Sequence, residues 1–77
     1  ENSILVYPNP SDGMFYIELV DYSDAIIQIY SSKGQLIREL HITQPKSQIN
    51  LSNQSKGVYW MKVIGENGIY HVPLVRL

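Results

Sequence analysis

The 77-residue sequence contains no cysteine, which excludes a disulfide scaffold, a thiolate metal site and a thiol nucleophile. No apolar run approaches the length of about 18 residues that a membrane-spanning helix needs, and no basic segment leads into a signal-peptide core. Charge is also scarce, because six basic and seven acidic residues leave a formal net charge of −1. Without a basic surface to follow phosphates, nucleic acid is not an expected partner.

Alanine occurs once, whereas isoleucine occurs ten times and valine six times. β-branched residues pack well on strands and are less favourable in helices. No segment carries the apolar spacing of an amphipathic helix without a turn interrupting it. The composition therefore predicts an all-β chain. Its length allows one small domain, whose core leaves little room for a deep catalytic pocket.

Turn-forming clusters recur about every ten residues and separate seven short runs rich in β-branched and aromatic residues. We predict strands over residues 4–7, 14–19, 25–30, 35–41, 47–51, 58–64 and 69–75. Seven short strands at this spacing are typical of an antiparallel β-sandwich. We expect hairpin turns at Gly34 and at Asn67-Gly68, where residues that tolerate positive φ lie between two strands.

Period-two alternation along the strands predicts which side chains face the core. The expected inward residues are Phe15, Ile17, Leu19, Ala25, Ile27, Ile29, Tyr59, Met61 and Val63. Lys62 marks the other face of its strand as the outer one, so Trp60 is expected at the surface or at a sheet edge. The alternation of the last run is ambiguous. Pro73 has no backbone N–H, which predicts that this strand lies at a sheet edge or contains a bulge.

Residue types used in catalysis are present, but not in a catalytic pattern. His41 and His71 lie in or beside strand runs, and no serine follows a strand-to-helix turn of the kind that positions a hydrolase nucleophile. Asp21 and Asp24 lack the spacing of a calcium loop. We therefore expect no catalytic residue, no metal and no cofactor. Two binding or structural readings remain open: a carbohydrate-binding accessory module that uses Trp60 and the tyrosines, and a purely structural spacer.

The segment Tyr7-Pro8-Asn9-Pro10-Ser11-Asp12-Gly13, followed by an apolar run, forms a loop that two prolines stiffen. This opening resembles the start of the type A C-terminal sorting domain of the type IX secretion system of certain Gram-negative bacteria. Further blocks follow in the family's order. Residues 25–37 resemble its middle hairpin, Gly57-Val58-Tyr59 begins a stretch similar to its Gly-x-Tyr strand, and residues 72–77 resemble its terminal strand.

The resemblance implies an immunoglobulin-like sandwich that spans residues 1–77 as one domain and ends a longer exported protein. The cargo would precede Glu1, which agrees with a chain that starts without Met. The family's domain folds in the periplasm and directs its cargo across the outer membrane to the cell surface or the medium. Its implied partners are the outer-membrane translocon components that recognise it and a sortase-like cysteine protease that removes it.

The same resemblance suggests which residues meet the translocon. The candidates are Pro8, Asn9, Pro10 and Gly13 in the stiff loop and Val72, Leu74, Val75, Arg76 and Leu77 in the terminal strand. A stiff loop loses little entropy on docking, and a terminal strand with an unpaired edge can dock by strand addition. The family usually has a lysine entering this strand. Here Pro73 stands near that place, and Arg76 carries a positive charge at a different position.

Overall fold

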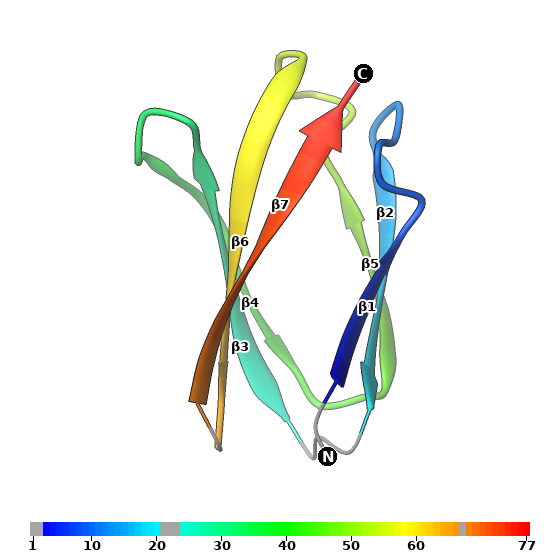
Figure 1. Cartoon of the computed structure of the whole chain (residues 1–77), viewed down its shortest axis with the longest axis vertical. Coiled ribbons are helices and arrows are strands. Elements are labelled where there is room, and N and C mark those ends of the chain that lie inside the picture. The colour runs from blue at the N-terminus through cyan, green and yellow to red at the C-terminus, as the bar shows by residue number, and fades with distance from the viewer. Residues whose placement is uncertain (1–2, 21–23, 67) are drawn as a thin grey trace.

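A computed structural model describes residues 3–20, 24–66 and 68–77, and within them seven strands form two antiparallel sheets (Figure 1). The strands are β1 (Ser3–Tyr7), β2 (Met14–Val20), β3 (Ala25–Ser31), β4 (Leu36–Ile42), β5 (Lys46–Asn50), β6 (Gly57–Gly65) and β7 (Gly68–Arg76). One sheet has the order β1-β2-β5 and the other β4-β3-β6-β7. The described residues include no helix that could span a membrane. The predicted all-β, immunoglobulin-like sandwich is confirmed, and no strand end differs from its predicted position by more than one residue.

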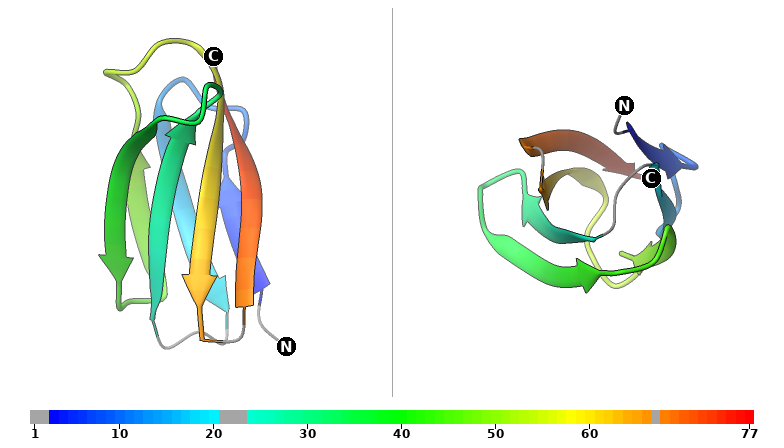
Figure 2. Two further views of the ribbon diagram at one scale, coloured as in Figure 1. Left: turned by 90° about the vertical axis from the view of Figure 1, so that its left-hand side faces the viewer. Right: turned by 90° about the horizontal axis from the view of Figure 1, so that it is seen from below.

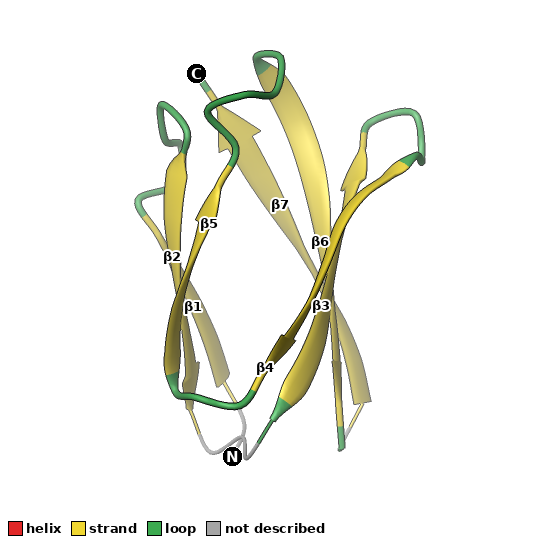
Figure 3. Ribbon diagram, turned by 180° about the vertical axis from the view of Figure 1, so that it is seen from behind, coloured by secondary structure: helices red, strands yellow, loops and turns green. Residues whose placement is uncertain are grey.

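The two sheets face each other, as the end-on view in Figure 2 and the rear view in Figure 3 show, and the strands of both sheets contribute buried core residues. Each inner face is built from alternate strand residues, because successive side chains of a strand point to opposite faces. All nine residues predicted to face inward are buried. The sequence patterns did not assign four further hydrophobic residues that are buried among the described ones: Ile42, Ile49, Leu51 and Leu74. Trp60 is 45% exposed on the outer face of the four-stranded sheet, as predicted.

The pairing of β6 with β7 settles the ambiguity of the last strand. Nine residue pairs run from Gly57–Arg76 to Gly65–Gly68 without a shift in register, so β7 contains no bulge along β6. Leu74 pairs with the inward-facing Tyr59, whereas Pro73 pairs with the outward-facing Trp60. β7 is an edge strand of its sheet, which is one of the two places predicted for Pro73.

The loops between strands gather at two opposite ends of the sandwich (Figure 1). The β1–β2 loop (residues 8–13), the β3–β4 turn, the β5–β6 loop (residues 51–56) and the end of β7 lie at one of them, the apical end. Ser3, the first residue of β1, lies at the other. The predicted turn at Gly34 is confirmed: this residue has φ +87°, and its N–H donates to Ser31 O at 2.9 Å. Of the second predicted hairpin turn, Gly68 pairs with Gly65, while Asn67 lies outside the described residues.

Candidate functional site

The side chain of Asn9 connects the β1–β2 loop to β7. Its Nδ2 donates a hydrogen bond to Pro73 O at 2.7 Å, and the Val75 N–H donates to Asn9 Oδ1 at 2.9 Å. A carboxamide carries one donor and one acceptor in the geometry of a peptide group. Asn9 therefore occupies the place on β7 that a peptide group of a neighbouring strand would take.

The backbone of Ser11 continues this pairing. Its N–H donates to Val75 O at 2.9 Å, and the Leu77 N–H donates to Ser11 O at 2.8 Å, which makes a parallel bridge between Ser11 and Arg76. Ser11 is only 4% exposed, and its Oγ donates to Met14 O and accepts from the Gly13 N–H at 3.1 Å. The prediction of an unpaired edge along residues 72–77 is thus wrong from Pro73 onward, because Asn9 and Ser11 satisfy the edge donors and acceptors there.

Arg76 connects the end of β7 to the opposite sheet. Its Nε donates to Leu51 O and its Nη2 to Ser52 O, each at 3.0 Å, while Nη1 donates to Leu77 O. Leu51 and Ser52 directly follow β5, so the guanidinium group spans the space between the two sheets at the apical end. Its planar set of donors suits several carbonyl oxygens at once, which a lysine ammonium does not match in shape.

Gly13 completes the apical site at the point where the β1–β2 loop passes the β5–β6 loop. Its carbonyl accepts a hydrogen bond from the Leu51 N–H at 2.7 Å. The residue has φ +146°, and a Cβ placed on it would lie 2.5 Å from Ser52 Oγ and 3.0 Å from Ser52 Cα. Both the backbone conformation and the close approach therefore require glycine here.

The structure brings the predicted loop residues and the end of β7 together at the apical end, whereas Val72 lies midway along β7 opposite Met61, and the predicted residues have different roles. Leu74 is completely buried and acts in packing, Val72 is half-buried, and Leu77 is 60% exposed. The resemblance did not point to Ser11, Leu51 or Ser52 as members of this site. Leu51 and Ser52 take part through main-chain groups, and Ser11 bonds to β7 through its main chain, so no residue type in the sequence identifies these contacts.

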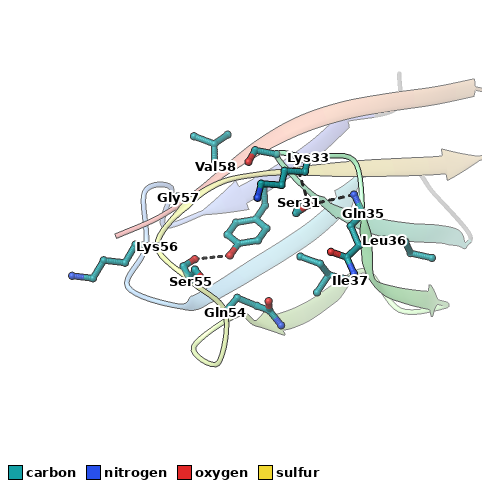
Figure 4. A pocket seen from close by; sticks show the side chains of 12 residues that line it. Ser31, Lys33, Gln35, Leu36, Ile37, Gln54, Ser55, Lys56, Gly57 and Val58 are labelled. Atoms are coloured by element: carbon teal, nitrogen blue, oxygen red, sulfur yellow. Dashed lines mark hydrogen bonds between the residues drawn. The ribbon is translucent and has the colours of Figure 1, made fainter.

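A second feature of the apical end is an open groove of about 510 Å³ between the β3–β4 turn and the β5–β6 loop (Figure 4). Its rim is polar, with Ser31 Oγ accepting from the Lys33 and Gln35 N–H groups at 3.2 Å. The buried Tyr59 also lines this groove, and its hydroxyl donates to Ser55 O at 2.5 Å. This bond holds the β5–β6 loop to β6. The sequence also suggests Gly57 and Tyr59 as structural turn residues, but both lie within β6, which begins at Gly57.

Replacing Tyr59 by phenylalanine removes this bond and leaves the ring in place. We expect Tyr59→Phe to lower the free energy of unfolding by about 1–2 kcal/mol, because the Ser55 carbonyl loses its partner at a partly buried position. Urea unfolding of residues 1–77 measures the change. Tyr7→Phe is the matched control: the Tyr7 hydroxyl lies 3.3 Å from Glu18 Oε1 on an exposed face, so its loss should change stability by less than about 0.5 kcal/mol. Equal effects of the two substitutions would contradict this role for Tyr59.

Comparison with protein families shows which family the chain belongs to. Residues 5–75 match the family described as secretion system C-terminal sorting domain. The chain belongs to this family, the sorting domains of the type IX secretion system. The match spans nearly the whole chain, including the β1–β2 loop and most of β7. No curated protein matches the sequence.

Among the described residues of this sorting domain, few titratable side chains lie close to one another as they do in catalytic or metal sites. His41 Nε2 lies 3.5 Å from Asp24 Oδ2, but both side chains are more than half exposed, where an ion pair contributes little. No set of three or more histidine, aspartate or glutamate residues in the described ranges is grouped to hold a metal. The contacts that distinguish the apical site are hydrogen bonds between main-chain groups and the side chains of Asn9, Ser11 and Arg76.

Proposed function

We propose that this domain is a non-catalytic C-terminal secretion signal. It directs an attached cargo protein across the outer membrane through the type IX secretion system, and a sortase-like cysteine protease then cleaves it off. Family membership supports this function. The observation that carries it is the joining of the β1–β2 loop to the end of β7, which makes one surface from the two segments expected to meet the translocon.

The start of β1 and the end of β7 lie at opposite ends of the sandwich, which suits a secretion signal that carries its cargo at one end and is recognised at the other. β1 begins at Ser3, at the end of the sandwich opposite the apical site (Figure 1). A cargo attached before Glu1 would therefore leave the apical surface accessible to translocon components while the protein is in the periplasm. Cargo release would place the product at the cell surface or in the medium.

Within the proposed recognition surface, exposed residues would contact the translocon directly, and buried residues would hold the exposed ones in place. Leu77 is exposed, and Arg76 lies at the same end of β7. Leu74 supports the surface from the core. The residues proposed to form or support it remain Pro8, Asn9, Pro10, Gly13, Val72, Leu74, Val75, Arg76 and Leu77.

Among the described residues, the exposed aromatic rings of Tyr7, Tyr16 and Trp60 do not form a single platform for a sugar. Tyr7 and Tyr16 stack with ring centroids 6.0 Å apart on the outer face of the three-stranded sheet. Trp60 lies on the outer face of the other sheet, with Tyr30 as its cross-strand partner. Carbohydrate recognition needs several rings that converge on one ligand, so this separation favours the secretion signal over the carbohydrate-binding alternative.

A reporter fusion tests the proposed function. Residues 1–77 are joined to the carboxyl end of a periplasmic reporter in a host with a type IX system, and the reporter is measured in cells and medium. We expect it to leave the periplasm only when the domain is attached. Trp60→Ala is the matched surface control and should be exported like the parent, because Trp60 lies outside the proposed surface. A stable fusion that stays in the periplasm would contradict the proposal and favour a spacer.

A further inference from the structure

The hydrogen bonds of β7 show which of its main-chain groups point toward its outer edge. Asn9 and Ser11 bond to groups of Pro73, Val75 and Leu77, all at odd positions. In an antiparallel pair, successive residues direct their main-chain groups alternately toward and away from the partner strand. Since the register with β6 has no shift, the even residues of β7 face β6 and the odd ones face the edge. The missing N–H of Pro73 therefore falls on the edge and removes no bond to β6.

The same alternation places the main-chain groups of Ile69 and His71 on this edge. The edge of residues 69–77 thus presents the N–H groups of Ile69, His71, Val75 and Leu77 and the C=O groups of Ile69, His71, Pro73 and Val75. Asn9 and Ser11 bond to the last half of this row, from Pro73 O to the Leu77 N–H. No described residue forms a backbone bond to the edge groups of Ile69 and His71.

We propose that residues Pro8–Ser11 form a displaceable latch on β7, and that an extended segment of a translocon component takes the place of this latch. The segment would pair with β7 from Ile69 to Leu77. This inference rests on the proposed function, since it specifies how the translocon component binds the recognition surface. The latch itself shows the chemistry of the occupant, because a peptide-like amide and a true backbone already sit on this edge.

The hydrogen bonds favour such an exchange. The latch contributes four bonds to β7, and a strand along residues 69–77 can remake these four and also pair with the groups of Ile69 and His71. The bonds of Ser11 Oγ to Met14 O and from the Gly13 N–H lie within the loop, so they can persist when the loop leaves β7. The Leu51 N–H to Gly13 O bond can likewise remain and hold the far end of the loop in place.

Side chains beside this edge indicate the sequence of the incoming segment. β1 and β7 are edge strands of different sheets, and in Figure 1 they approach each other toward the apical end and diverge toward the opposite end. Ile4 and Val6 of β1 and Val72 of β7 are only partly buried against the core. A segment added to β7 directs alternate side chains to the same face as Val72. We therefore expect apolar residues at alternate positions of the partner, which cover these three side chains.

A disulfide that locks the latch tests the exchange. Ser11 and Arg76 are bridge partners, and neighbouring strands lie about 5 Å apart, within the Cα range of a disulfide. In the reporter fusion, the oxidised double variant Ser11→Cys with Arg76→Cys should be exported at least about tenfold less than Arg76→Cys alone, and a reductant should return its export to the level of that single variant. Each single variant is the control for the substitution itself. Retention of the parent fusion would contradict the proposed function, whereas export of the oxidised double variant at the level of the single variants would overturn the latch.

Hydrogen exchange on purified residues 1–77 tests the latch independently of export, even if Arg76→Cys alone blocks export. The Val75 N–H bonds to the latch, whereas the N–H of its neighbour Leu74 faces β6. We expect Val75 to exchange at least about tenfold faster than Leu74, and Asn9→Ala to accelerate Val75 without changing Leu74. Equal protection of the two amides would mean that the latch opens only when the whole domain unfolds, which would overturn the inference.

Discussion

Leu74→Ala is expected to lower the free energy of unfolding by about 2–5 kcal/mol, as large-to-small substitutions in a packed core do. Leu74 is completely buried although it lies on an edge strand, and its cross-strand partner is the buried Tyr59. Domains of this size have stabilities near the low end of the usual range of about 5–15 kcal/mol. We therefore expect a large fraction of the variant to be unfolded at growth temperature and export of the fusion to fail. Urea unfolding of residues 1–77 measures the first effect.

Leu77→Ala is the matched control, because it makes the same substitution three residues further along the chain. Leu77 is 60% exposed, so its truncation should change stability by less than about 0.5 kcal/mol. A decrease in export by Leu77→Ala without a loss of stability would therefore report on recognition, whereas Leu74→Ala reports on folding. If Leu74→Ala unfolds at the urea concentration of the parent, β7 does not pack as the structure shows.

The strands and their inward faces could be predicted because the signals for them are local. β-branched runs, turn residues and period-two alternation act over two to seven positions, and they identified Phe15, Ile27 and Met61 as core residues. The last strand was ambiguous because apolar residues occupy both of its faces. Only its register with β6, which places Leu74 opposite Tyr59, determines which face is buried.

The apical site could be predicted only in part, for a physical reason. The resemblance pointed to the loop and the terminal strand as separate candidates, but the bonds from Asn9 to Pro73 and Val75 join residues 64 and 66 positions apart. A side-chain amide that replaces a peptide group leaves no periodic pattern in the sequence. The expectation of a free edge failed for the same reason: an edge strand can be recognised from Pro73, but what covers it depends on the tertiary fold.

Gly13→Ala is expected to destabilise the domain by about 2–4 kcal/mol, because two costs act together. The residue has φ +146°, which an L-residue adopts only with strain of about 1–3 kcal/mol. The new Cβ would also meet Ser52 Cα at 3.0 Å, a backbone atom that cannot move without shifting the β5–β6 loop. A shift there would disturb the Leu51 N–H to Gly13 O bond and the Arg76 contacts to this loop. Thermal and urea unfolding of residues 1–77 measure the loss.

Two further variants separate the strain from the clash. Gly34→Ala introduces a side chain at φ +87° with no other atom within 4 Å, so it should cost only the conformational strain, about 1 kcal/mol. Ser52→Gly in the Gly13→Ala background removes Ser52 Oγ and Cβ, at 2.5 and 3.2 Å from the new methyl group, and should recover part of the lost stability. Non-additivity is expected for residues in direct contact. If Ser52→Gly lowers the stability of the parent and of Gly13→Ala by the same amount, the close approach of the two loops does not explain why glycine stands at this position.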